Sequence, residues 1–321
     1  MASITQGAAR HHPSRRRPMT RPHHRAAVAA GISLLCAGLL HPALAAGRKG
    51  LSVGMTMTSA EYADRFERYP GLIDSVRVFS AGAPPAWTDS RILQLKAQGI
   101  VPFISHKTYD PNAFKAWLLA MPADLPMVYL AHCHECEADM PASTYVEHQR
   151  SYWNVVQALP ASIRQRVKYG PIQTKQWTEN YGRSYATYDP GIGDFWGVDA
   201  YVNTWGLVYP DASTWLSQIR AYATGGRPKW LPELGVICMP DDADDSARAA
   251  WIESVAAILE ADRSFKLVLW WDTLGTPGGE VDGVGTVRNF RLSEKYTTAG
   301  GTVPVKPSKQ AWRRFMRRNA P

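Results

Sequence analysis

Between residues 51 and 271, short apolar runs alternate with segments whose apolar positions repeat at helical spacing. Most of the apolar runs are continuous, which is typical of parallel strands covered on both faces. Aspartates that can cap a helix precede several amphipathic segments, at Asp89, Asp110 and either Asp245 or Ser246. The predicted strands are 51–57, 75–80, 100–105, 127–132, 167–172, 195–202, 229–234 and 266–271, and the clearest helices are 110–120, 141–159, 213–223 and 246–261.

Eight strands alternating with helices predict an α/β fold, a single-domain (β/α)8 TIM barrel. A doubly wound open sheet is the main alternative, but no glycine-rich dinucleotide loop follows the first strand. Long loops rich in glycine, proline and aromatic residues follow several strands, at 81–87, 174–193, 203–212 and 273–287. In a barrel, loops after the strands form the catalytic face.

The first 46 residues read as a secretory signal peptide. Six arginines precede an apolar run at 26–40, no acidic residue is present, and Ala43-Leu44-Ala45 offers a cleavage site. The apolar run is too short for a membrane span. We therefore expect a signal peptide at 1–46, a barrel at 47–321 and a secreted protein, extracellular or periplasmic, whose start is Met1 or Met19.

Removing this leader changes the charge balance. The chain has 36 basic and 28 acidic residues, but the leader contains six of the basic ones, so the remainder carries a net charge of only +2. Nothing in this balance favours nucleic-acid binding. We expect no nucleic-acid partner, no stable membrane insertion and a monomer.

Two predicted strands deliver a glutamate at their ends. The run Tyr129-Leu130-Ala131-His132 leads into Cys133-His134-Glu135, and Trp230-Leu231-Pro232 leads into Glu233. A carboxylate at the tip of a buried strand is costly unless it has a partner or a function. Two of them at one barrel mouth match the carboxylate pair that glycoside hydrolysis uses.

At these positions the sequence resembles the clan A glycoside hydrolases, which are retaining enzymes built on this barrel. That clan has its acid/base after strand four, where Glu135 lies, and its nucleophile after strand seven, where Glu233 lies. The closest resemblance is to glycoside hydrolase family 26, the mannanase-containing family, in which histidine precedes the acid/base as His134 does here.

The resemblance also implies substrate-binding residues. Arg77 matches the clan arginine beside the nucleophile, and Tyr201 resembles the tyrosine that hydrogen-bonds the nucleophile. Trp270 and Trp271 fit the sugar platform on strand eight. The chain departs from family 26 after Glu135, where the sequence continues as 136–139, Cys-Glu-Ala-Asp, instead of an aromatic-rich segment.

Other residues are candidates by position alone. His106 follows strand three and either lines a subsite or is a solvated loop residue. Asp199 shares its side of strand six with Tyr201, where it either binds substrate or pairs with Lys107 or Arg77. His134 either orients a sugar hydroxyl or the acid/base, or is a polar residue of the strand, and Trp205 lies in a loop where it can stack on a sugar.

After the leader is removed, three cysteines remain, Cys133, Cys136 and Cys238. An odd count allows at most one intramolecular bridge. We expect a disulfide from Cys136 or Cys133 to Cys238. The Cys-x-x-Cys motif lacks a second ligand pair at zinc spacing, so we expect neither a metal nor a cofactor.

We predict a secreted retaining glycoside hydrolase that cleaves a β-linked polysaccharide or oligosaccharide. Glu135, in apolar surroundings, would have a raised pKa and donate a proton, and Glu233, held by Arg77 and Tyr201, would stay ionised and attack. One alternative is a carbohydrate-binding barrel without catalytic activity. A second is a metal-dependent hydrolase that uses His132, His134 and cysteines.

Overall fold

The computed structural model describes residues 50–202, 208–237, 239, 241–242, 244–273, 290–292, 296–298, 301–303 and 307–320. The leader, Cys238 and two parts of the expected loops, 203–207 with Trp205 and 274–287, lie outside these residues. No helix in the described ranges is long and apolar enough to cross a membrane.

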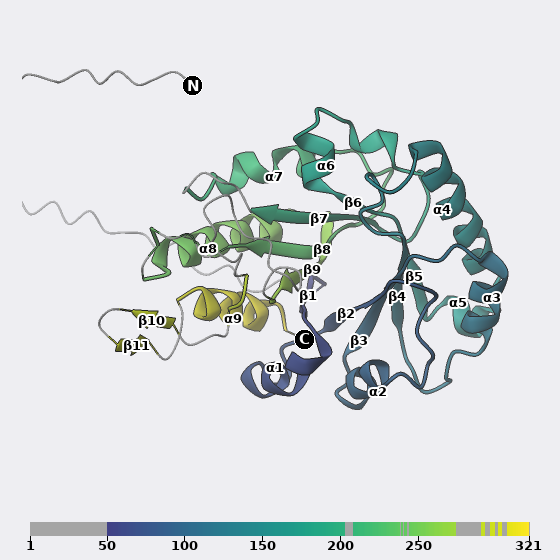
Figure 1. Cartoon of the computed structure of the whole chain (residues 1–321), viewed down its shortest axis with the longest axis horizontal. Coiled ribbons are helices and arrows are strands. Elements are labelled where there is room, and N and C mark those ends of the chain that lie inside the picture. The colour runs from purple at the N-terminus through teal and green to yellow at the C-terminus, as the bar shows by residue number, and fades with distance from the viewer. Residues whose placement is uncertain are drawn as a thin grey trace, which may run out of the picture. The chain divides into compact units, whose positions relative to one another are not determined.

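Nine parallel strands form one sheet in the order β5-β4-β3-β2-β1-β9-β8-β7-β6, and the sheet curls into a barrel (Figure 1). Every predicted strand is present, with ends that differ by one or two residues. A short antiparallel pair, β10 (Tyr296–Thr298) and β11 (Gly301–Val303), is separate from the barrel. The barrel strands are β1 (Ser52–Thr56), β2 (Ser75–Ser80), β3 (Val101–His106), β4 (Val128–His132), β5 (Val167–Tyr169), β6 (Ile172–Thr174), β7 (Trp196–Val202), β8 (Lys229–Val236) and β9 (Phe265–Trp271).

The predicted fifth strand is split into β5 and β6, which flank Gly170 and Pro171. β5 pairs with β4, and β6 pairs with β7, so together they close the ring as one bent barrel strand. Gly170 is required at the bend, because a Cβ there would lie 2.4 Å from the carbonyl oxygen of Phe195. The (β/α)8 prediction is therefore confirmed, with eight barrel positions made from nine strand segments.

Helices surround the barrel on its outer side (Figure 1). The predicted helices at 110–120, 141–159, 213–223 and 246–261 are confirmed as α3, α4, α7 and α8. The helices are η1 (Ser59–Glu61), α1 (Tyr62–Arg68), α2 (Ser90–Ala97), α3 (Pro111–Leu119), α4 (Ala142–Gln157), α5 (Ala161–Arg164), α6 (Lys175–Glu179), η2 (Tyr185–Thr187), α7 (Ala212–Ala221), α8 (Ser246–Ala261) and α9 (Pro307–Asn319).

Aspartate side chains cap several of these helices as expected. Asp89 accepts from the amide of Arg91, and Asp110 accepts from that of Ala113. The cap of α8 differs from the prediction, because Asp242 accepts from two amides of its first turn. The side chain of Asp245 instead accepts hydrogen bonds from Ser308 at the start of α9.

Aromatic side chains fill the barrel interior below the ends of the strands. Phe195 and Trp230 stack with ring centroids 3.7 Å apart, and Phe103 meets both rings edge-on. Phe103 also lies under the guanidinium of Arg77, at 5.4 Å. This buried aromatic layer is apolar, and an apolar surrounding strengthens the electrostatic interactions just above it.

Candidate active site

Arg77 is the centre of the charged cluster at the barrel mouth. It is fully buried on β2, with its guanidinium between the rings of Phe79 and Phe103. Its Nη1 lies 2.8 Å from Asp199 Oδ1 and 2.7 Å from Glu233 Oε1, and its Nε donates to Ser105 Oγ at 3.0 Å. The sequence prediction that Arg77 lies beside Glu233 agrees with this geometry.

Asp199 and Glu233 are directly opposite each other on neighbouring strands, β7 and β8. Both are buried, with 0% and 4% of their surface exposed. β8 continues for three residues beyond Glu233, so this glutamate lies within the strand rather than at its end as expected. Its backbone is paired with Asp199 on β7, while the register towards β9 shifts between Leu231 and Leu234.

Glu135 lies in the loop after β4 and is half-buried. One carboxylate oxygen of Glu135, one of Asp199 and one of Glu233 all lie within 4.8 Å of one another. The fold therefore brings the two glutamates together, although they are 98 residues apart in the sequence. Asp199 is a third carboxylate of the same cluster.

Burial raises the pKa of both Asp199 and Glu233. For Asp199 the pKa rises to about 8, mainly through burial and against the opposing charge of Arg77. The pKa of Glu233 is also raised well above its usual range, by burial and then by the charge of Asp199. Because one guanidinium serves both carboxylates, they titrate as a pair that retains a proton where an exposed carboxyl would have lost it. This direction is opposite to the sequence expectation that Glu233 is simply ionised.

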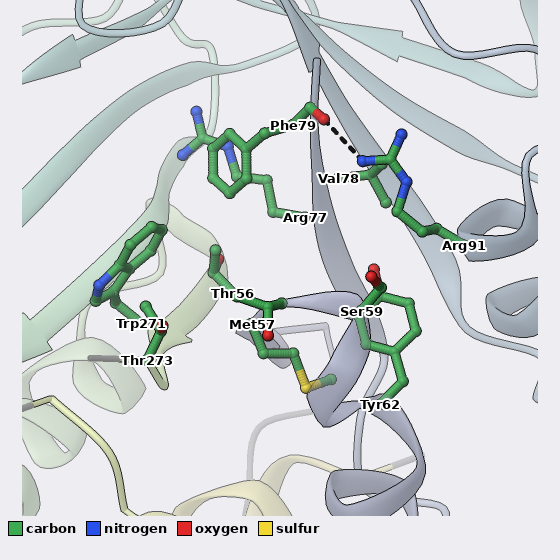
Figure 2. Close-up of a pocket in the computed structure, with 11 residues that line it drawn as sticks. Thr56, Met57, Ser59, Tyr62, Arg77, Val78, Phe79, Arg91, Trp271 and Thr273 are labelled. Atoms are coloured by element: carbon green, nitrogen blue, oxygen red, sulfur yellow. Dashed lines mark hydrogen bonds between the residues drawn. The ribbon is translucent and has the colours of Figure 1, made fainter. Parts of the chain in front are cut away.

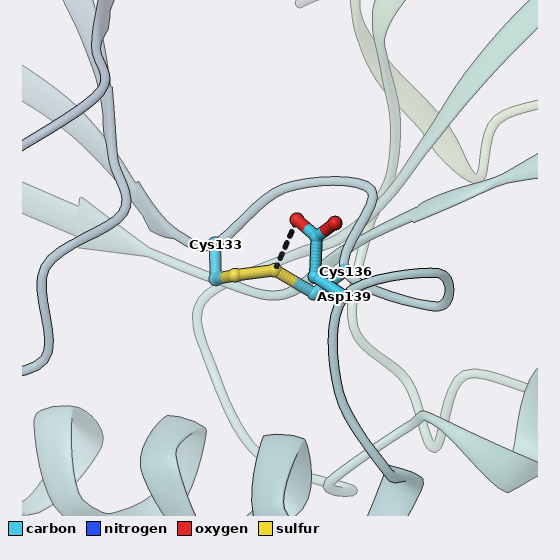
Figure 3. Close-up of side chains that lie close together, drawn as sticks. All are labelled: Cys133, Cys136 and Asp139. Atoms are coloured by element: carbon cyan, nitrogen blue, oxygen red, sulfur yellow. Dashed lines mark hydrogen bonds between the residues drawn. A yellow bond between two sulfur atoms is a disulfide. The ribbon is translucent and has the colours of Figure 1, made fainter.

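A disulfide joins Cys133 to Cys136 on either side of Glu135 (Figure 3). The expected bridge to Cys238 is therefore wrong, because both candidate partners are already used. The sequence could not distinguish the pairings, since bridge formation depends on how sharply the loop turns. Asp139 lies near this bridge, 4.0 Å from Cys136 Sγ, and forms an ion pair with Lys107.

Glu137 is a further carboxylate of this loop that the sequence analysis did not assign to the site. It is 7% exposed and accepts a hydrogen bond from the amide of Thr174 on β6 at 2.6 Å. Burial raises its pKa to about 7, and the charge of Glu135 adds to the rise. The sequence feature that could have assigned Glu137 to the site is its position two residues after Glu135.

A pocket of about 320 Å³ opens beside the cluster, within the size range of small-molecule sites. Figure 2 shows Trp271 and Thr273 on one side of this pocket and Tyr62 and Arg91 on the other. Arg77 also lines it, and so connects the pocket to Glu233. Trp271, one of the two predicted platform residues, thus lines the pocket.

His134 and Tyr201 lie near the carboxylate cluster, where their rings contact Phe79 and Trp271. The ring of His134 is 5.2 Å from that of Phe79, and burial together with the nearby charge of Arg77 keeps its pKa well below the usual range. Tyr201 packs edge-on against Trp271 at 6.0 Å. In the described ranges Tyr201 makes no hydrogen bond to Glu233, in contrast to the expectation from the resemblance.

Two other candidates face away from the mouth. Trp270 is fully buried, donates to the carbonyl of Phe290 and packs against Trp312 of α9, so it has no face available to a sugar. His106 is fully buried against Phe114 of α3. Neither lines a subsite, because successive residues of a strand point to opposite faces.

A metal-dependent hydrolase finds little support in this geometry. Cys133 and Cys136 are bonded to each other, and His132 packs against Tyr152 of α4 on the outer side of the barrel. The three clustered carboxylates are chemically suited to a hard cation. However, Asp199 and Glu233 already share the Arg77 guanidinium as their counter-charge.

No protein-family model matches this sequence, and no curated protein sequence does either. Solved structures match its fold. Cel5A of Thermotoga maritima, solved with a mannotriose substrate, has a TM-score of 0.52 at 15% identity over 82% of this chain and 98% of its own. A β-glycosidase from Pyrococcus horikoshii has a TM-score of 0.52 at 12% identity over 81% and 85%.

A β-galacturonidase from Eisenbergiella tayi has a TM-score of 0.54 at 12% identity. The match covers 84% of this chain and 51% of that larger protein. At such identities the likeness concerns the fold alone. This chain therefore has the (β/α)8 barrel of known glycosidases.

Proposed function

We propose that this protein is a retaining glycoside hydrolase of the clan A type, with Glu135 as acid/base and Glu233 as nucleophile. The observation that carries the proposal is the cluster of Glu135, Asp199 and Glu233, whose carboxylate oxygens approach within 4.8 Å around one buried arginine. Retaining enzymes need two carboxyl groups about 5–5.5 Å apart, too close for a water between them. The barrel shared with known glycosidases is consistent with this chemistry.

In the first step Glu135 gives its proton to the leaving oxygen while Glu233 attacks the anomeric carbon. The glycosidic bond breaks, and a covalent glycosyl–enzyme ester forms at Glu233. The loop position of Glu135, half-buried and open to the mouth, suits a group that must reach a leaving oxygen. The buried strand position of Glu233 suits a nucleophile that must not move.

In the second step Glu135 takes a proton from water, and the resulting hydroxide attacks the same anomeric carbon. The ester to Glu233 breaks and the sugar leaves with retained configuration. Because one residue acts as acid and then as base, its carboxyl must remain in the same place through both steps.

Asp199 influences whether its neighbour Glu233 is protonated. Its pKa of about 8 allows it to hold a proton at neutral pH. In this proposal the pair shares one proton, and attack starts from the form in which Asp199 carries it, because Arg77 then stabilises the ionised Glu233. Neutral His134 and Trp271 then provide a polar and an aromatic contact for the sugar at the same mouth.

The substrate we propose is a β-linked polysaccharide or oligosaccharide, met after secretion. The pocket beside Arg77 combines the Trp271 ring with polar side chains such as Ser59 and Arg91, a combination that suits sugar rings. No observation singles out family 26 among the barrel glycosidases.

The test is to trap the intermediate. We expect the protein without its leader to hydrolyse at least one member of a β-glycan panel with retention, followed by proton NMR of the anomeric signal. A 2-deoxy-2-fluoro glycoside of that sugar with a good leaving group should then label Glu233, and mass spectrometry of peptides locates the label.

Glu67→Gln, an exposed glutamate of α1, provides the control and should label as the wild type does. Sugar binding without turnover or label would favour the non-catalytic carbohydrate-binding barrel. Inverted product, or a label elsewhere, would contradict the assigned roles.

A further inference from the structure

The loop that carries Glu135 has an unusual backbone. Cys133 and Glu135 both have positive φ angles, 45° and 55°, which side chains other than glycine rarely adopt. Asp245 is the only other non-glycine residue in the described ranges with this property. Two such residues within three positions require surroundings that hold them there.

The Cys133–Cys136 disulfide encloses these residues in a four-residue covalent ring (Figure 3). Bulky and buried side chains surround the ring, since Cys133 and Cys136 pack with Tyr145 and Tyr188. A ring this short leaves the backbone of His134 and Glu135 few conformations. Without it, relaxation to negative φ would turn the Glu135 side chain away from the mouth.

Hydrogen bonds tie both ends of this ring to neighbouring strands. The amide of Cys133 donates to the carbonyl of His106 on β3 at 2.7 Å, and that of Glu135 donates to Ile172 on β6 at 3.4 Å. Glu137 continues the attachment through the amide of Thr174. The ring is thus held on one side by β3 and on the other by β6.

We propose that the Cys133–Cys136 disulfide is a positioning device for the acid/base, which fixes the Glu135 carboxyl where it can both give and take the proton. This inference rests on the proposed function of Glu135. The two cysteines touch neither sugar nor reacting atoms in this role. They act through the backbone between them.

The test compares Cys133→Ala/Cys136→Ala with the wild type on two aryl glycosides of one sugar. One has a 2,4-dinitrophenyl leaving group, which needs no proton, and the other has phenyl, which does. We expect kcat/KM to fall by about tenfold or more for the phenyl glycoside and by less than about threefold for the dinitrophenyl one. Equal losses on both substrates, or no loss, would overturn the proposal.

Reduction provides a second arm, in which the bridge is broken only after the protein has folded with it. Dithiothreitol supplies two electrons and two protons to the bridge and is itself oxidised to its cyclic disulfide. In a Cys238→Ser background, reduction should reproduce the leaving-group-dependent loss, and reoxidation by oxidised glutathione should restore activity. Activity that is unchanged after complete reduction, verified by thiol titration, would overturn the proposal.

Amide hydrogen exchange separates this inference from the proposed function. On reduction, the amides of Cys133 and Glu135 should exchange faster while those of β8 stay protected. If the wild type hydrolyses no glycan, the proposed function fails, yet exchange still reports whether the bridge holds the loop. Unchanged exchange in the reduced protein would overturn the positioning role even in an active enzyme.

Discussion

Glu233 belongs to a continuous buried strand, whereas Glu135 belongs to a loop held by a disulfide. The side of the proposed nucleophile is held by backbone pairing with β7 and by one arginine shared by two carboxylates. The acid/base side reaches its geometry through a covalent ring with two left-handed residues. The difference suggests a division of roles. The barrel strand fixes Glu233, the proposed nucleophile, whereas a disulfide-closed loop positions Glu135, the proposed acid/base.

Replacing the nucleophile should have the largest effect. Glu233→Ala removes the covalent step, which nothing else in the site can perform, so we expect turnover to fall by about 10⁴-fold or more for every leaving group. Steady-state rates on aryl and natural substrates measure this, with circular dichroism to verify the fold. A loss that depends on the leaving group would reverse the roles of the two glutamates.

Replacing the acid/base should give a smaller loss that depends on the substrate. Glu135→Ala should lose about 10²–10⁴-fold on glycosides with poor leaving groups, the usual contribution of general acid–base catalysis. With a dinitrophenyl glycoside the intermediate still forms and then accumulates, because no base activates water. Azide should rescue this variant and give a β-glycosyl azide, detectable by NMR, and its absence would count against the assignment.

Most of the barrel could be predicted from the sequence because parallel strands leave continuous apolar runs. The apolar runs do not show which residues of a strand face the site, because neighbouring residues point to opposite faces of the sheet. Trp270 and Trp271 are adjacent, and only strand parity distinguishes the residue packed on Trp312 from the one that lines the pocket. His106 was misassigned for the same reason, since Ser105 is the residue that faces Arg77.

The remaining features depend on tertiary contacts that a single sequence does not record. The cysteine pairing depends on a tight loop, and the position of Glu137 depends on an amide of β6, 37 residues later. The raised pKa of Glu233 depends first on its burial and then on the charge of Asp199, its partner on the neighbouring strand β7.

The buried pair of Asp199 and Glu233 should make the stability of the fold decrease as pH rises from acidic to neutral values. Asp199 keeps its proton up to about pH 8 when folded and loses it near pH 4 when unfolded, so its contribution to stability falls as pH rises between these values. Asp199→Asn should remove a slope of about 1 kcal/mol per pH unit. Urea unfolding at pH 5 and pH 7.5 measures it, and parallel pH profiles would contradict the raised pKa.

His106 on β3 should give the opposite pH dependence of stability, and the effect should be smaller. Burial lowers the pKa of His106 to about 4, so this imidazole stays neutral in the folded protein while the unfolded chain protonates near pH 6.5. Stability should therefore fall as pH drops from about 6.5 towards 4. His106→Leu should reduce this loss of stability at acidic pH. Denaturant midpoints at pH 7 and pH 5 that differ as much as in the wild type would exclude a contribution from His106.

The bend at Gly170 and Pro171 has a consequence for the thermal inactivation of the protein. β5 and β6 are three-residue strands that each pair on one side only, β5 with β4 and β6 with β7, so the ladder around the ring is interrupted at the bend. On slow heating we expect this seam to open before the rest. Because it lies between the Glu135 loop and the Asp199 strand, the half-life of activity should be shorter than the half-life of the helical circular dichroism signal.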